Sequence, residues 1–217
     1  MACEIEPDSD LAWCKFGAQE LMAGKDYIEA GNGLPFVNRG ASSLGSGGTP
    51  VGNTSGEIPW GAGGFIIAMP QHFAIKKYFG KNPGRAEYES LLASALLHEL
   101  VHFRQYRHID HDCDTAPDEL TDKEPETLLK CYYSDPREVE AHAAQIAFLL
   151  GPASGGESCD AATVFESNLV GRRISARLDA LHGGPLAAEY EGFRTKLTDT
   201  VSEWRDRLFP FTEDRTT

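Results

Sequence analysis

A His-Glu-x-x-His spacing at residues 98–102 is the clearest sign of chemistry in the sequence. His98 and His102 lie four residues apart, so on a helix their imidazoles project from one face about one turn apart and can bind a single zinc ion. Glu99, beside the first histidine, is the residue type that takes a proton from a zinc-activated water. The spacing predicts a hydrolytic zinc site with His98 and His102 as metal ligands and Glu99 as general base.

The residues around this motif have the pattern of a long helix. The stretch from Arg85 to Arg107 contains no glycine or proline, and it follows the turn-forming Asn82-Pro83-Gly84. Residues that recur at intervals of four and three form one stripe of this helix: Leu91, Ala95, His98, His102 and Gln105. We therefore expect a helix over about 85–107, buried on one side, with its histidines where the core opens into a cleft.

A second helix is predicted over residues 134–150. Ser134 or Asp135 suits the N-cap, Pro136 fits the first turn, and Gly151-Pro152 ends the helix. Two histidines leave a zinc site short of a protein ligand. The carboxylates of this second helix are the candidates for the third ligand.

Glu140 is the carboxylate that we favour as third ligand. It shares a helix face with several alanines, and small residues would let this helix come close enough to the first for Glu140 to reach the metal. Glu138 lies about 200° around the helix from Glu140, so both cannot point at one ion. The stripe of Glu138 also includes the polar His142 and Gln145, whereas the stripe of Glu140 is apolar.

With these residues in place, the sequence resembles the gluzincin branch of the zinc metallopeptidases. In that branch the third ligand is a Glu on the next major helix, here within Glu138-Val139-Glu140-Ala141. The resemblance covers residues 85 to 150, roughly a third of the chain. It implies a zincin-like catalytic core with one zinc ion per chain, held by His98, His102 and Glu140.

The metzincin branch is the alternative. His98, His102 and His108 have the spacing of its three histidine ligands, but Gln105 stands where that branch has a glycine. The glycine allows a sharp turn that swings the third histidine back to the metal. If the helix continues through Gln105, His108 lies about 240° around the axis and faces away. All three methionines precede the motif, so the downstream Met turn of metzincins is missing as well.

The fold expected for the chain is α+β and mainly helical, with a zincin-like core, a short sheet and a C-terminal helical hairpin. Residues 1–64 would hold a helix from Asp10 to Ala23 and a Gly-rich segment, Gly31 to Gly64, that is either a surface loop or a flap over the cleft. Residues 65–151 would form the catalytic core, including a strand at Phe65–Pro70. Residues 160–209 would form a hairpin around a turn at 182–185, packed on the core.

Other polar residues have less specific patterns. Tyr132, Tyr133 and His72 are weak candidates for the donor that stabilises a transition-state oxyanion. The acidic stretch from Ile109 to Glu126 could hold a second cation, but it lacks the glycine and terminal glutamate of a calcium loop. A solvated linker is the simpler interpretation of that stretch.

Composition and charge limit the classes of molecule that the protein is expected to bind. The formal net charge of −13 and a pI near 4.9 argue against nucleic acid and leave a protein or peptide substrate. The acidic N-terminus is unlike a signal peptide, and no apolar run approaches 18 residues, so we expect a cytoplasmic protein that does not enter membranes. Export by a signal-independent route and the oligomeric state stay open.

The five cysteines are odd in number and show no Cys-x-x-Cys spacing. Free thiols in a reducing compartment are therefore expected. A bridge between Cys113 and Cys131, which flank the loop between the two site helices, would contradict a cytoplasmic location.

The function that these patterns predict is a zinc-dependent metalloprotease that hydrolyses peptide bonds with zinc-activated water. The alternative is a non-catalytic, metallopeptidase-like binding or immunity module in which zinc is structural. A purely structural site would not need Glu99 and would need a fourth protein ligand that closes it. The sequence does not identify the substrate or the cleavage preference.

Overall fold

The computed structural model describes residues 6–25, 84–105, 124–152 and 159–210 with their side chains, and four short strands by their backbone alone. These ranges hold helices α1 (Pro7–Met22), α3 (Arg85–Gln105), α5 (Pro125–Leu128), α6 (Pro136–Leu150), α7 (Ala161–Glu166), α8 (Leu169–Leu178) and α9 (Ala187–Leu208). A π-helical turn, Leu129–Tyr133, follows α5, and a 3₁₀ turn, Asp179–Leu181, follows α8.

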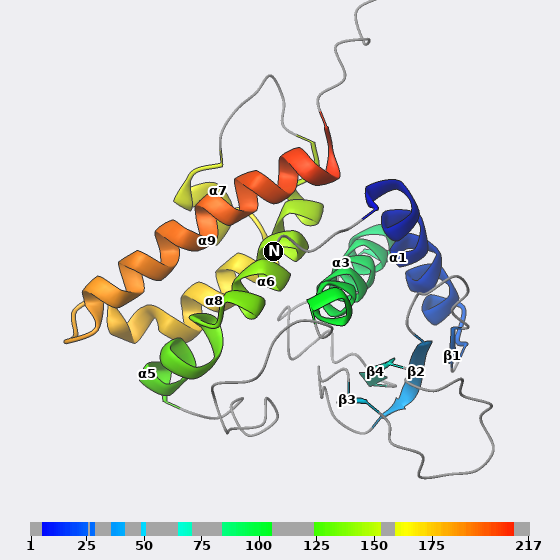
Figure 1. The fold of residues 1–217 in the computed structure, drawn as a ribbon, viewed down its shortest axis with the longest axis horizontal. Helices are drawn as coiled ribbons and strands as arrows, with labels where there is room; N and C mark the ends of the chain where they lie inside the picture. Colours follow the sequence, from blue (N-terminus) through cyan, green and yellow to red (C-terminus); the bar gives the residue numbers. More distant parts are fainter. Residues whose placement is uncertain are drawn as a thin grey trace, which may run out of the picture.

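Four of these helices pack in succession. α1 lies on α3, α3 lies on α6, and α6 lies on α9 (Figure 1). The motif helix α3 and the second predicted helix α6 are therefore neighbours, each covered on its other side by a further helix. This arrangement places the polar residues of α3 and α6 at a junction in the middle of the stack.

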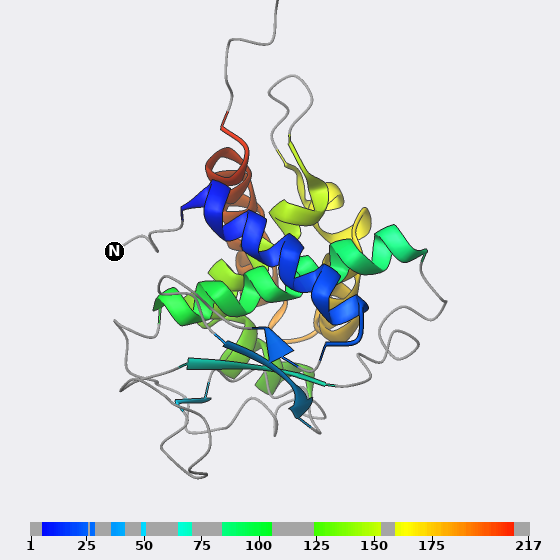
Figure 2. The ribbon, with the colours of Figure 1, turned by 90° about the vertical axis from the view of Figure 1, so that its right-hand side faces the viewer.

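The prediction of an α+β fold with a short sheet is wrong for the part of the chain whose side chains are described. That part is 83% helical and contains no strand. Backbone strands β1 (Tyr27–Ile28), β2 (Phe36–Ala41), β3 (Thr49–Pro50) and β4 (Phe65–Pro70) run in the order β1-β2-β4-β3. They lie at the edge of the helical body (Figure 2), and no described core side chain belongs to them. Mutually buried helices form the described core, so the class is helical.

α6 begins and ends, and α3 begins, as their sequences predict. Asp135 is the N-cap of α6 and its Oδ1 accepts a hydrogen bond from the Arg137 backbone N–H at 2.9 Å, while Pro136 opens the first turn. Gly151 ends α6 with a φ of 71°, a left-handed conformation that favours glycine. α3 begins at Arg85 and is helical through Gln105.

An ion pair joins α1 to α3 two residues beyond the histidine motif. The carboxyl group of Asp10 is fully buried, and its Oδ1 accepts a hydrogen bond from Nη2 of Arg104 at 3.1 Å. α1 itself begins three residues before the predicted Asp10 start. The pair fixes the end of α3 that carries His102 against a second helix.

The C-terminal region contains a break that the sequence pattern did not predict. The first predicted hairpin helix is divided into α7 and α8 at Asn168, whose side chain accepts from the Gly171 N–H at 2.8 Å and donates to the Val164 carbonyl at 2.6 Å. α7 and α8 approach so closely that a Cβ on Gly171 would lie 1.8 Å from the Val164 oxygen. Glycine is therefore required at the elbow between them.

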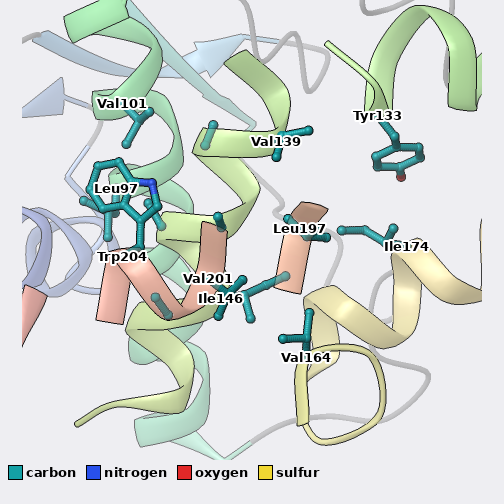
Figure 3. Packing of buried hydrophobic residues seen from close by; sticks show 14 of the residues in the cluster. Leu97, Val101, Tyr133, Val139, Ile146, Val164, Ile174, Leu197, Val201 and Trp204 are labelled. Carbon is teal, nitrogen blue, oxygen red and sulfur yellow. The ribbon is translucent and has the colours of Figure 1, made fainter. Parts of the chain in front are cut away.

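Side chains from α1, α3 and the C-terminal helices form one hydrophobic cluster. Figure 3 shows Ile146 of α6 beside Val201 of α9, with Leu197 facing Ile174 of α8. Cys14, Cys131 and Cys159 are free thiols. Among the described helices, none combines the length and apolar character needed to cross a bilayer.

Candidate metal centre

Ligand atoms of three residues from α3 and α6 lie within 4.8 Å of one another. Nε2 of His98 and Nε2 of His102 are 3.0 Å apart, as expected for imidazoles one helical turn apart. The carboxylate of Glu138, on α6, places Oε1 3.3 Å from Nε2 of His102 and Oε2 3.7 Å from Nε2 of His98. Among the described residues, these three form the only group of histidine, cysteine or carboxylate ligands that could hold a metal ion.

The separations are compatible with a shared metal ion. Zinc bonds of about 2.0–2.1 Å in tetrahedral geometry place neighbouring ligand atoms about 3.3 Å apart. The two histidine nitrogens are 3.0 Å apart, Nε2 of His102 is 3.3 Å from Oε1 of Glu138, and Nε2 of His98 is 3.7 Å from Oε2. Two imidazoles and one carboxylate are also ligand types that zinc accepts, and three protein ligands leave a fourth position open. The three residues could therefore hold a metal ion between the two helices.

The structure places a different carboxylate beside the histidines from the one that the sequence favoured. Glu138, not Glu140, lies next to His98 and His102, two residues before the predicted ligand. Glu140 instead accepts a hydrogen bond from the side-chain amide of Gln105, with Nε2 and Oε2 3.3 Å apart.

The packing of α6 explains the error. Its buried apolar residues extend around most of the helix, because α6 lies between α3 and α9: Val139, Ala141, Ala143, Ala144, Ile146 and Ala147. An apolar stripe therefore does not single out the side that faces α3. The stripe that does face α3 is the polar one of Glu138, His142 and Gln145, in which three polar residues recur at intervals of four and three.

The charges within the cluster favour a proton on His102. Burial opposes that charge, but the negative charge of Glu138 and its hydrogen bond outweigh burial and raise the pKa of His102 to about 9. Burial also tends to raise the pKa of Glu138, yet His102 and His98 lower it below the usual carboxyl value. The pKa of His98 is lowered by burial and by its neighbours His142 and His102. The metal-free cluster thus contains a His102–Glu138 ion pair with a neutral His98.

Glu99 is the buried carboxylate next to this cluster. Its side chain is 7% exposed, and Oε2 has no hydrogen-bond partner among the described residues. Burial raises the pKa of Glu99 to about 7; the positive charge of His102 opposes the shift and the negative charge of Glu138 adds to it. A carboxyl group with a pKa near neutrality can both accept and return a proton at physiological pH.

Gln105 connects the cluster to the start of α6. Its Oε1 lies 3.0 Å from Nδ1 of His102, on the side of the ring that faces away from the metal position. Its Nε2 donates to the Arg137 carbonyl and to Oε2 of Glu140, each at 3.3 Å. Gln105 lies on the predicted stripe of the histidines, but its residue type alone indicates no role at a metal site.

Aromatic rings cover the α6 side of the cluster. The His142 ring packs on the His98 ring with centroids 4.6 Å apart, and its Nε2 is 3.8 Å from Oε2 of Glu138. The Tyr132 hydroxyl hydrogen-bonds to Glu138, and burial together with that negative charge raises its pKa well above the usual value. Tyr133 is turned toward α8, where its hydroxyl accepts from Arg177 at 3.4 Å.

Tyr132 is therefore the tyrosine of the pair that lies at the site, whereas Tyr133 belongs to the core.

Several other predicted features lie outside the described residues: His72, the alternative ligand His108, Cys113 and most of the acidic 109–126 stretch. The proposed flap at 31–64 is also outside them, apart from the backbone of β2 and β3.

Comparisons of the chain with protein-family models, with curated proteins and with solved structures find no match.

Proposed function

We propose that this chain is a zinc-dependent peptidase whose metal is held by His98, His102 and Glu138, with Glu99 as general base. The observation that supports the proposal is the cluster of His98, His102 and Glu138 from two packed helices, with the histidine nitrogens 3.0 Å apart and the carboxylate oxygens 3.3 and 3.7 Å from them. The pattern agrees with the gluzincin type, in which two histidines of one helix and a Glu of the next bind the ion. Glu138 takes the place that the sequence suggested for Glu140.

In this proposal the metal, Glu99 and Tyr132 have different roles in peptide hydrolysis. Zinc supplies a Lewis acid that acidifies water and polarises a carbonyl. Glu99, with a pKa of about 7, accepts the proton of the attacking water and returns it to the leaving amine. The Tyr132 hydroxyl, beside Glu138 and held in its protonated form, orients that carboxylate by a hydrogen bond. The net charge of −13 favours a neutral or cationic peptide as substrate.

The first test separates metal binding from turnover. Glu99→Gln keeps the size of the side chain and leaves the three ligands in place, so the variant should retain one zinc per chain. It should lose at least a factor of about 10² in kcat, because the proton acceptor is gone. Metal content by mass spectrometry and cleavage of a peptide library provide the two measurements. Full activity in Glu99→Gln would remove the general base from the proposal.

A second pair of variants tests the ligand set. Glu138→Ala leaves two histidines and should lose zinc and activity together, with affinity lower by orders of magnitude. Glu140→Ala is the matched control on the same helix and should keep most of its zinc, because Glu140 bonds to Gln105 and not to the cluster. Zinc loss from Glu140→Ala with retention in Glu138→Ala would reverse the assignment.

One observation favours a second candidate function, a non-catalytic module with structural zinc. His142 lies close enough to Glu138 to be a fourth ligand after a small movement, and a closed set of four protein ligands is typical of structural zinc. His142→Phe distinguishes the two. Retained zinc affinity and activity support an open catalytic site, whereas a loss of affinity comparable to that of Glu138→Ala supports a closed structural one.

A further inference from the structure

Gln105 occupies a position in which its amide can be oriented in only one way. Two acceptors face one end of the side chain: the Arg137 carbonyl and Oε2 of Glu140, both 3.3 Å from Nε2. Neither of these groups can donate a hydrogen bond, so the NH₂ end must point to them. The carbonyl end, Oε1, then has to face His102, 3.0 Å from Nδ1.

This orientation determines which nitrogen of His102 carries hydrogen when the ring is neutral. Oε1 of Gln105 accepts only, so Nδ1 must carry the N–H that donates to it. Nε2, on the other side of the ring, is then left with a free lone pair. That nitrogen is the one that lies 3.0 Å from Nε2 of His98 and 3.3 Å from the Glu138 carboxylate.

We propose that Glu140 and Gln105 form a positioning relay that fixes the tautomer and ring orientation of His102 for metal binding. The proposal rests on the metal centre proposed above. Glu140 acts on α3 from α6: it holds the Gln105 amide, and the amide holds the imidazole. Outer hydrogen-bond partners of this kind typically change metal affinity by about 10–100-fold when they are removed. Glu140 thus has a role near the ion although it is not a ligand.

The primary test is zinc affinity, measured by competition with a chromophoric chelator on the full chain. Gln105→Leu removes the acceptor of the His102 N–H and should lower zinc affinity about 10–100-fold. Glu140→Leu removes one of the two acceptors that orient Gln105 and should lower affinity by a smaller factor. The absorption spectrum of the Co²⁺-loaded protein should shift in Gln105→Leu, because the imidazole is no longer held in one orientation.

A double variant tests the direction of the hydrogen bonds. In Gln105→Glu with Glu140→Gln, the new carboxylate at 105 accepts from both His102 and the amide at 140, while the Arg137 carbonyl loses its donor. This exchange should recover part of the zinc affinity that is lost in Gln105→Leu. Gln105→Glu alone puts two carboxylates in contact and should lower the unfolding temperature of the metal-free protein relative to the double variant.

The chain offers a matched control pair between α1 and α3. Gln19 donates to Oε1 of Glu89 at 2.8 Å, which is the same chemistry between two helices, but the bond is exposed and Glu89 lies more than two helical turns before His98. Gln19→Leu and Glu89→Leu should leave zinc affinity and the Co²⁺ spectrum unchanged. Far-UV circular dichroism and thermal unfolding of the metal-free variants check that each one folds.

The outcomes distinguish a failure of the relay proposal from a failure of the metal-centre proposal. A Gln105→Leu protein that binds zinc as tightly as the wild type overturns the relay and leaves the centre intact. A folded double variant that binds no better than Gln105→Leu also overturns it. If Gln105→Leu fails to fold, the zinc affinities of Glu140→Leu and of the double variant still test the relay. A wild-type chain that binds no zinc overturns both proposals.

Discussion

At the scale of single residues, the proton on His102 connects metal binding to pH. The buried carboxylate of Glu138 raises the pKa of His102 to about 9, so the metal-free protein carries a proton on this ring at pH 7. Nε2 must lose that proton before it can bind zinc, since only the neutral imidazole is a ligand. Zinc uptake by the proposed site would therefore be coupled to proton release.

The expected result is a zinc affinity that rises about tenfold per pH unit between pH 7 and pH 9 and then levels off. Calorimetry in buffers of different ionisation enthalpy should detect release of about one proton per zinc at pH 7. The metal-free protein should behave in the opposite way. The pKa of His102 is higher in the folded than in the unfolded chain, so its stabilising effect is complete below about pH 6.5 and is lost as pH rises through about 9.

A Glu138→Gln variant is the control for this interpretation. Without the negative charge that raises the pKa of His102, the metal-free protein should lose the decline in stability between pH 7 and pH 9. A zinc affinity that is flat across this range in the wild type would mean that His102 is already neutral at pH 7.

At the scale of secondary structure, the sequence predicted the site helices well and their orientation poorly. Asp135, Pro136 and Gly151 act locally, through a cap, a fixed φ and a left-handed turn, so they identify the ends of α6 without knowledge of its neighbours. The side of α6 that faces α3 is a property of the packing. It could not be read from an apolar stripe because α6 is buried against two helices.

The motif helix was easier to interpret for the same physical reason. His98 and His102 are polar residues within a run of buried leucines and alanines, and their spacing alone puts them on one face of α3. The fold class was harder. Apolar strand-like segments of the N-terminal region suggested a sheet in the core, whereas the described core is made by helices that bury one another.

The close contact between α7 and α8 predicts that replacement of Gly171 destabilises the protein. A Cβ at Gly171 would lie 1.8 Å from the Val164 oxygen, so Gly171→Ala must push the two helices apart. The substitution should reduce the free energy of unfolding by about 1–3 kcal/mol. Gly192→Ala in α9 is the matched control. Its Cβ would meet no atom within 4 Å, and the higher helix propensity of alanine should stabilise the protein by about 0.5–1 kcal/mol.

Urea unfolding monitored by circular dichroism measures both changes. A neutral Gly171→Ala would show that α7 can move away from α8 without loss of packing, contrary to the close approach in the structure.

At the scale of the whole molecule, the proposed zinc ion would join elements that are distant in sequence. Two ligands belong to α3, which packs on α1, and the third belongs to α6, which packs on α9. A ligand that binds only the folded chain stabilises it by about 2.7 kcal/mol at a free concentration one hundred times its Kd. For a chain of this size that corresponds to a rise in Tm of about 5–10 °C.

Thermal unfolding with zinc and with a chelator provides the measurement. The wild type should unfold at the higher temperature when zinc is present, and Glu138→Ala should unfold at one temperature in both conditions. A zinc effect of equal size in both proteins would mean that the ion stabilises the chain from another place.

The contact between α3 and α6 has a further consequence. An ion bound by residues of both helices would tolerate little change in their spacing, because zinc bonds vary by only a few tenths of an ångström. The affinity for the proposed ion would therefore report changes in the distance between the two helices. A core substitution between α6 and α9 that displaces α6 slightly, such as Ile146→Ala, would be recorded as weaker metal binding even though it touches no ligand.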